Sequence, residues 1–167
     1  MTFKLRKLSV KDGEDVYNML QDIDNNENGF INHCRGMDYE HFGNWLMSSA
    51  EKDKGIGLES WMVAQTIYWL YVDNTPVGIA KLRHGLTRAL EIEGGHLGYA
   101  IAYPHRNRGY CTKLIGLILP EAAKMGIDQV LVTAKNSNQP SIKAALNNGG
   151  IVEKCENGRH YIWIKTR

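Results

Sequence analysis

The chain has 167 residues, a net charge of +2, 43% hydrophobic residues and 23% charged residues. These values are typical of one soluble globular domain, and no apolar run approaches the roughly 20 residues that a membrane-spanning helix requires. The first ten residues, MTFKLRKLSV, lack the apolar stretch and cleavage site of a signal peptide. We therefore expect one cytoplasmic domain over residues 1–167, with no membrane partner.

The first part of the chain is predicted to be mostly helical. Residues 2–9 alternate like a strand, and residues 12–23 place four apolar side chains on one helical face, those of Val16, Met19, Leu20 and Ile23. A second helix is predicted over residues 38–52, and the glycine-rich stretch 53–60 ends it.

The middle of the chain changes to strand patterns. Residues 61–72 are aromatic and β-branched, residues 77–84 alternate, and the turn 73–76 joins them, which predicts an antiparallel hairpin. After a loop, residues 94–103 make the next predicted strand. The remaining predicted elements are a helix over 109–125, a strand over 129–134, a helix over 140–148 closed by Gly149, and strands over 150–155 and 160–165. This order predicts an α+β fold with layers of helices on a mixed, mostly antiparallel sheet of about seven strands and about four helices.

Charge, cysteines and histidines exclude several classes of site. Residues 11–60 hold eleven acidic and four basic residues, a net −7, so the remainder carries +9. Such asymmetry indicates either solvated helix faces or an acidic segment that attracts a cationic partner beside a basic part that holds an anionic one. There is no basic run of the kind that binds nucleic acid. The three cysteines and six histidines show no zinc-site or H-E-x-x-H spacing, so neither a metal nor a disulfide framework is expected.

The segment PHRNRGYCTKL, residues 104–114, follows a strand and opens a helix. The first amides of a helix are unpaired and sit at the positive end of its dipole, an arrangement that binds anions such as phosphate. Gly109 lets the backbone approach a ligand, Arg106 and Arg108 add positive charge, and Cys111 and Thr112 are small. The alternative is that R-x-x-G before a helix is a common turn. The Walker pattern is absent from the chain, and the stretch KGIGLES lacks the last glycine of a dinucleotide fingerprint.

Three motifs resemble those of the GNAT (Gcn5-related N-acetyltransferase) superfamily. Residues 106–111, RNRGYC, are similar to the family's Q/R-x-x-G-x-G/A loop, and Asn138 with Ser141 and Gly149 resembles its N-x-x-S/A helix entry. The string from Arg83 to Tyr99, with its GGHLGY segment, resembles a bacterial subgroup of predicted acetyltransferases whose acceptors are unassigned. The predicted element order is similar over nearly the whole chain.

The resemblance implies a GNAT-like fold and acetyl-CoA as the acyl donor, with its pyrophosphate on the backbone amides of the loop and no metal. The implied activity is transfer of the acetyl group to a primary amine of a small molecule or peptide, by direct attack on the thioester. The implied cofactor-binding residues are Ile101, Ala102, Tyr103, Arg106, Asn107, Arg108, Gly109, Tyr110, Cys111, Thr112, Asn138 and Ser141. Asn138 is also expected to cap the helix that follows it. A homodimer is left open.

Three positions depart from the family pattern. Cys111 replaces a glycine or alanine, the proline usual at Tyr103 is displaced to Pro104, and the tyrosine that often acts as general acid is replaced by Ala145. No general acid is therefore assigned. The missing tyrosine also supports an alternative, a non-catalytic acyl-CoA-binding or regulatory module.

An amine acceptor requires a base, because a lysine-like amine with a pKa of about 10.4 is neutral in only about one molecule in a few thousand at pH 7. His96 occupies the position where many relatives carry a glutamate base, and Glu93 and His84 are the next candidates. The alternative for His96 is a histidine that caps a sheet edge or bonds a neighbouring carbonyl. An N–H between Ile101 and Tyr103 is expected to stabilise the thioester oxygen as it gains charge. Cys111 is interpreted as a small space-filler rather than an acyl-cysteine nucleophile.

Overall fold

The computed structural model describes all residues from 1 to 167. The strands are β1 (Phe3–Lys7), β2 (Gln65–Val72), β3 (Thr75–Arg83), β4 (Leu97–Ile101), β5 (Gln129–Lys135), β6 (Ile151–Glu156) and β7 (Arg159–Lys165). The helices are α1 (Glu14–Gln21), α2 (Tyr39–Asp53), α3 (Arg88–Ile92), α4 (Tyr110–Lys124) and α5 (Gln139–Asn147), with a 3-10 turn, η1, at Tyr103–His105. No helix combines the length and the apolar character needed to cross a membrane.

The predicted elements are all present. The structure also contains two short elements, α3 and η1, that were not expected from the sequence. Helix α3 lies in the stretch expected to be a loop, and it begins because the Thr87 side chain accepts a hydrogen bond from the Leu90 N–H at 3.3 Å. The strand expected over 94–103 is shorter, because η1 follows it directly at Tyr103. Both additions flank β4.

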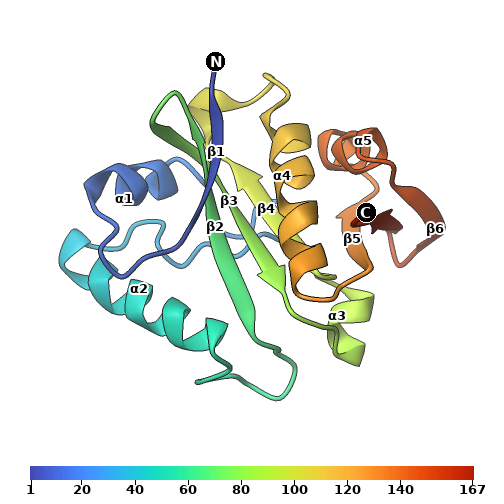
Figure 1. Cartoon of the computed structure of the whole chain (residues 1–167), viewed down its shortest axis with the longest axis horizontal. Helices are drawn as coiled ribbons and strands as arrows, with labels where there is room; N and C mark the ends of the chain where they lie inside the picture. Colours follow the sequence, from blue (N-terminus) through green and yellow to red (C-terminus); the bar gives the residue numbers. More distant parts are fainter.

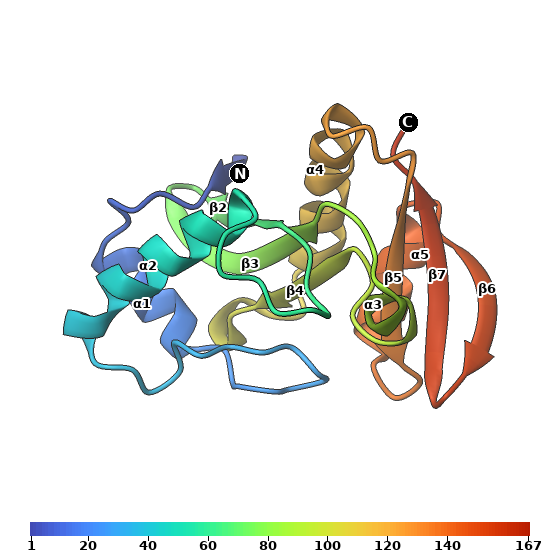
Figure 2. The same cartoon turned by 90° about the horizontal axis from the view of Figure 1, so that it is seen from below.

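The seven strands form two antiparallel sheets rather than one continuous ladder. The first sheet has the order β1-β2-β3-β4 and the second the order β5-β7-β6. Figure 2 shows the two sheets on opposite sides of α4. The α+β architecture expected from the sequence is confirmed. The division into two sheets falls between β4 and β5.

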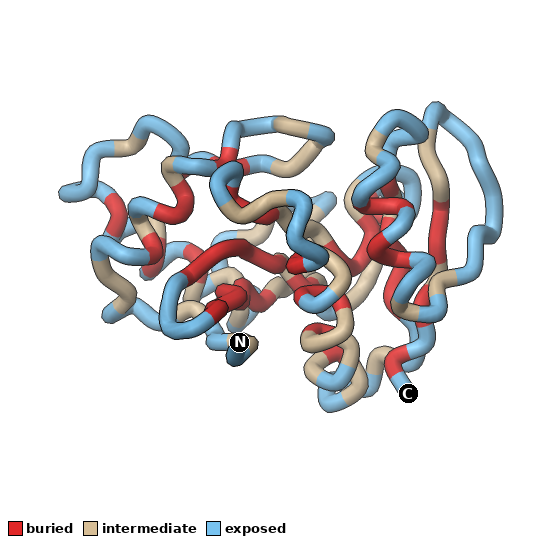
Figure 3. Tube along the Cα trace, turned by 90° about the horizontal axis from the view of Figure 1, so that it is seen from above, coloured by how far each residue is buried: buried red, intermediate tan, exposed pale blue.

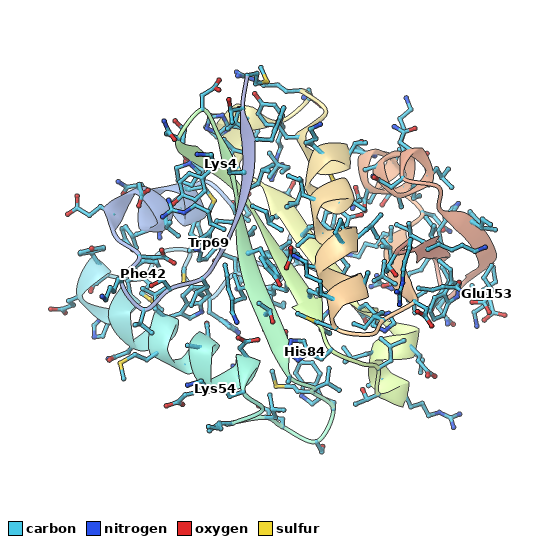
Figure 4. The ribbon with its side chains drawn as sticks, viewed as in Figure 1. Lys4, Phe42, Lys54, Trp69, His84 and Glu153 are labelled. Atoms are coloured by element: carbon cyan, nitrogen blue, oxygen red, sulfur yellow. The ribbon has the colours of Figure 1, made fainter.

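One face of the first sheet is covered by α1 and α2 (Figure 1). Their apolar stripes bury Leu20 and Phe42 against Trp69 of β2, and all three side chains are almost completely shielded from solvent. Figure 4 shows Phe42 and Trp69 on the same side of the sheet. Burial of side chains of this size contributes roughly 1.5–3 kcal/mol each, so this layer is firmly attached.

A second and larger core lies on the other face of the first sheet, where α4 and α5 pack between the sheets. It contains Leu114 and Ile118 from α4, Leu82 from β3, and Val132 and Ile162 from the second sheet. Figure 3 shows a buried stretch within β3, β5 and β7, in contrast to the edge strand β6, which is exposed throughout. The helices therefore hold the two sheets together on the side where the strands themselves do not pair.

Candidate active site

A cavity of about 730 Å³, which we call the central cavity, lies where the two sheets part. Its walls come from β4 and β5, the N-terminal turns of α4 and α5, the end of β3 and the segment 23–31. Ten of the twelve residues predicted to bind the cofactor line it; Ala102 and Arg108 do not. The structure therefore brings together segments that are far apart in the sequence.

The two sheets touch at one end of β4. The His96 N–H donates to the Leu131 carbonyl at 2.9 Å, and the Leu131 N–H donates to Nδ1 of the His96 ring at 2.9 Å. We call this pair of hydrogen bonds the His96–Leu131 strap. Gly95 permits the close approach, because a Cβ there would lie 2.4 Å from the Leu131 carbonyl oxygen and the residue has a φ of +64°. Beyond the strap β4 and β5 form no common ladder, so a gap opens between them.

The gap exposes one edge of β4. The Arg83 N–H bonds the His96 carbonyl and the Ala102 N–H bonds the Val77 carbonyl, so the even-numbered residues of this segment pair with β3. Alternation then directs the backbone groups of Tyr99 and Ile101 toward the gap. Of the three amides expected near the thioester, only that of Ile101 is unpaired, because the Ala102 and Tyr103 amides donate to Val77 and Asp22 carbonyls at 2.9 Å.

The loop before α4 presents a row of free amides. None of the N–H groups from Asn107 to Thr112 donates to a protein acceptor outside the regular elements, and the first amides of a helix have no partner within it. Asn107 and Gly109 have φ values of +61° and +76°, the left-handed conformation that turns successive amides toward one concave side. We call residues 107–112 the amide nest. Together with the dipole of α4, it is suited to hold a phosphate group.

Arg106 is less available to a ligand than the sequence predicts. Its Nη1 and Nη2 groups donate to the two carboxylate oxygens of Glu27 at 2.8 and 2.9 Å, and its Nε donates to the Ile101 carbonyl at 3.0 Å. The Arg106 side-chain hydrogen bonds hold the pKa of Glu27 below its usual range. Arg106 therefore fastens the segment around Glu27 to the end of β4, while Arg108 is exposed outside the cavity.

Cys111 lines the cavity in the first turn of α4. Burial raises the pKa of its thiol to about 12. A thiol that stays protonated at neutral pH is a poor nucleophile. Its environment is that of a small space-filling side chain.

Helix α5 contributes Asn138 and Ser141 to the cavity. Asn138 occupies the N-cap position as expected, and α5 begins directly after it, but its side chain makes no capping hydrogen bond. The Ser141 hydroxyl is hydrogen-bonded to the Tyr99 phenol. Ala145, which stands at the family's tyrosine position, is fully buried and lies one turn further along the same helical face. The Tyr99 hydroxyl therefore reaches α5 beside the position where the usual acid is missing.

Tyr99 combines access to the cavity with a protonated state. Burial is the main cause that raises the pKa of its phenol above the usual range, and the nearby Cys111 acts in the same direction. The phenol therefore carries its proton throughout the neutral range. Tyr99 and His96 are three residues apart, so strand alternation places their side chains on opposite faces, and the Tyr99 side lines the cavity.

The three predicted catalytic side chains are not brought together. His96 is buried, it does not line the cavity, and its Nδ1 is the acceptor in the strap. Burial, with a smaller contribution from Arg83, lowers its pKa to about 4. His96 therefore has a structural bond to the neighbouring strand, close to the alternative role, but its ring accepts from the Leu131 N–H rather than bonding a carbonyl.

His84 and Glu93 lie in different places. His84 contacts Thr66 at 2.7 Å and lies 3.5 Å from Asp53, beyond the end of β3 and outside the cavity (Figure 4). Glu93 does line the cavity, with one carboxylate oxygen 2.6 Å from Nη2 of Arg159. Of the three candidates, only Glu93 is therefore placed where a ligand in the cavity would meet it.

Sequence reasoning missed two cavity residues on β3, Lys81 and Arg83. They share a face of the sheet with Ile79, which is buried against α1 and α2. The sequence did contain a signal for them. The apolar side of β3, which includes Ile79, continues with the two cations Lys81 and Arg83 instead of further apolar residues. Elsewhere, Asp38, Glu40 and His41 have ligand atoms within 4.8 Å of one another, but all three are exposed and outside the cavity.

Several solved structures share this fold. A GNAT-family acetyltransferase from Streptococcus pneumoniae is 14% identical, with 97% of each chain covered and a TM-score of 0.63. The N-acetyltransferase PseH of Campylobacter jejuni, solved with acetyl coenzyme A, is 13% identical, with 99% of this chain and 100% of that chain covered and a TM-score of 0.63. An acetyl transferase from Salmonella typhimurium that modifies the N-terminal serine of a 50S ribosomal subunit protein is 13% identical, with 98% and 92% covered and a TM-score of 0.63.

Because all three sequence identities are low, these likenesses establish the fold and nothing beyond it. No curated protein sequence matches this chain at a significant level. The family described as "Acetyltransferase (GNAT) domain" matches residues 2–151, which is most of the chain and includes the amide nest and the whole of α5. The chain therefore belongs to the GNAT acetyltransferase family.

Proposed function

We propose that the chain is an acetyl-CoA-dependent N-acetyltransferase that moves the acetyl group to a primary amine by direct attack on the thioester. The observation that carries the proposal is the continuity between the amide nest and the gap beside β4, which both line one cavity. A phosphate-bearing donor held on the nest would extend its arm toward the free Ile101 amide. The Salmonella typhimurium protein of the same fold acts on an N-terminal serine, which agrees with an amine acceptor.

The donor side supplies two of the groups that the reaction needs. The Ile101 amide faces the gap and would stabilise the thioester oxygen as it gains negative charge. The Tyr99 phenol would donate a proton to the sulfur when the C–S bond breaks. Because a thiol has a pKa of about 8.5, coenzyme A departs as a thiolate with modest help, so this proton is useful rather than obligatory.

The acceptor must lose a proton before or during attack. We propose Glu93 for this step, because its carboxylate is at the cavity and a carboxylate takes a proton directly or through one water. The amine nitrogen then bonds to the acetyl carbon, the C–S bond breaks, and the thiolate takes a proton. The products are the N-acetylated acceptor and coenzyme A.

The test is an assay of free thiol with acetyl-CoA and a broad panel of amines, together with calorimetric titration of acetyl-CoA. We expect binding at micromolar concentrations and thiol release with at least one class of amine. Glu93→Gln should slow the release and leave acetyl-CoA binding intact, whereas the control Arg159→Gln breaks the same ion pair and keeps the carboxylate. Absence of acetyl-CoA binding at high micromolar concentration would refute the proposal.

The alternative is a non-catalytic acyl-CoA-binding or regulatory module, which the buried Ala145 at the usual tyrosine position favours. The same experiment separates the two. Tight acetyl-CoA binding without thiol release across the whole panel would establish the alternative.

A further inference from the structure

Lys81 and Arg83, which we call the cation pair, lie on the α1 and α2 side of the central cavity. Alternation along β3 places both on the same face as Ile79, which packs in the core with α1 and α2. Both side chains are half-buried. Burying a cation without a counter-ion is costly, so two such residues side by side require an explanation.

Neither member of the cation pair has a carboxylate partner. Lys81 Nζ donates to the Ile31 carbonyl at 2.6 Å and lies 4.6 Å from the centre of the Phe30 ring. Arg83 Nη1 donates to the Gly94 and Gly95 carbonyls at 3.2 and 3.1 Å. These contacts are all to neutral groups, so they orient the two cations and leave their charge uncompensated.

The acidic side chains that line the cavity are already engaged. Glu27 is paired with Arg106, and Glu93 with Arg159. The third, Asp24, is exposed and lies 3.5 Å from Arg35. The protein therefore supplies no anion for the cation pair.

The cation pair also has unused hydrogen-bond donors. An ammonium has three donors and a guanidinium five, and the contacts above use one from Lys81 and those of Nη1 from Arg83. The Nε and Nη2 groups of Arg83 have no acceptor, and no buried side-chain atom of the protein lacks a partner, so these groups face accessible space. Burial and the neighbouring Arg83 lower the pKa of Lys81 to about 8, which an incoming anion would reverse.

Gly98 leaves room for a ligand beside these donors. A Cβ built on Gly98 would lie in van der Waals contact with both groups, 3.8 Å from Arg83 Nη1 and 3.9 Å from the Phe30 ring, so the missing side chain leaves Arg83 uncovered on this side. Gly98 pairs with Lys81 across the strands and immediately precedes Tyr99, whose backbone faces the gap. A molecule on the cation pair would therefore lie next to the position proposed for the thioester.

We propose that the acceptor is an amine that also carries a carboxylate, which binds to Lys81 and Arg83 across Gly98. This inference rests on the proposed acetyl transfer. It differs from the alternative considered for the sequence, in which the acidic segment attracts a cationic partner. The cation pair also helps the chemistry, because nearby positive charge disfavours the protonated form of an amine and so raises the fraction that can attack.

Matched pairs of acceptors test the proposal, each pair differing only in the carboxylate: phenylalanine with phenethylamine, and leucine with isoamylamine. We expect kcat/KM to favour the amino acid by at least about tenfold, which corresponds to about 1.4 kcal/mol, because a hydrogen bond between charged groups is strong enough to supply that difference. Lys81→Met, which keeps the length of the side chain, should abolish most of this preference by raising KM. Lys81→Arg, which keeps the charge, should retain it, and Lys4→Met, which removes an exposed lysine of β1, should match the wild type.

Product binding separates this inference from the proposed function. N-acetylphenylalanine and N-acetylphenethylamine are titrated calorimetrically into the protein saturated with coenzyme A. Stronger binding of the carboxylate product that depends on Lys81 would support the anion site even if no thiol is released. The absence of thiol release would count only against acetyl transfer. Acetylation of both members of each pair at equal rates, or a preference that survives in Lys81→Met, would overturn the anion site and leave acetyl transfer standing.

Discussion

Replacing His96 by asparagine or by alanine separates a proton-transfer role from the strap that its side chain forms between β4 and β5. His96→Ala removes the acceptor of the Leu131 N–H, which is buried, and leaving a buried donor unpaired costs about 1–3 kcal/mol. Loss of the edge contact with Trp163, at 6.1 Å between ring centres, adds about 0.5–1.5 kcal/mol. His96→Asn places an amide oxygen near the position of Nδ1, so only the ring contact should be lost.

The pH dependence of unfolding gives an independent magnitude. The pKa of His96 is about 4 in the folded protein against an ordinary value of 6.5, so between these values the unfolded chain binds the proton and the folded chain does not. The contribution of neutral His96 to stability is therefore complete above about pH 6.5 and is lost as the pH falls toward 4. By linkage the loss is about 2 kcal/mol between pH 7 and pH 5. His96→Asn lacks this titration, so its stability should fall by about that much less over the same interval.

Urea unfolding of the three proteins at pH 7 and pH 5 measures these differences, and thiol release at pH 7 tests the chemistry. A strap predicts that His96→Asn keeps near-normal turnover. General bases contribute about 10²–10⁴-fold to rate. If His96→Asn keeps its stability and its acetyl-CoA affinity but loses turnover by about a hundredfold or more, the reasoning from the strap is refuted and the base role expected from the sequence is supported.

Two further predictions concern the donor side. Gly109→Ala and Gly126→Ala form a matched pair, because the two glycines flank α4 with φ values of +76° and +79° and a Cβ would meet no atom within 4 Å at either. Both variants should lose about 1–2 kcal/mol of stability, but only Gly109→Ala should weaken acetyl-CoA binding in calorimetry. Equal affinities of the two variants for acetyl-CoA would contradict the role of the amide nest. Tyr99→Phe removes the phenol proton and should slow thiol release by about tenfold or more at pH 7 with unchanged acetyl-CoA affinity, whereas Ser141→Ala keeps the phenol and should retain most of the rate. Because the pKa of Tyr99 is raised, the wild-type rate should show no loss from Tyr99 deprotonation up to about pH 10, and a wild-type rate in Tyr99→Phe would exclude the phenol as acid.

Local patterns predicted the elements other than α3 and η1, and they predicted the amide nest, because these features depend on neighbouring residues. A strand, a short turn with Gly109 and a helix start are enough to expose a row of amides. The partners of single side chains were not predictable in the same way. Arg106 bonds Glu27, which is 79 residues away, and His96 bonds Leu131, which is 35 residues away. Such contacts depend on how loops and sheets are placed in space, and no periodicity in the sequence encodes them.

The charge asymmetry of the sequence shows the same limit, because the net charge of a segment does not tell where its charged side chains lie relative to the cavity. The acidic segment 11–60 carries a net −7, yet its Glu27 is neutralised by Arg106 at the cavity. Water and dissolved ions separate the exposed acidic side chains of α1 and α2 from a ligand in the cavity. Exposed charges are screened beyond about 8 Å at physiological ionic strength, whereas half-buried charges are screened much less. The acidic segment can therefore affect how often an amine arrives, but the cation pair on β3 decides which amine stays. On this argument, raising the salt concentration should slow association of cationic acceptors and leave the preference for a carboxylate largely unchanged.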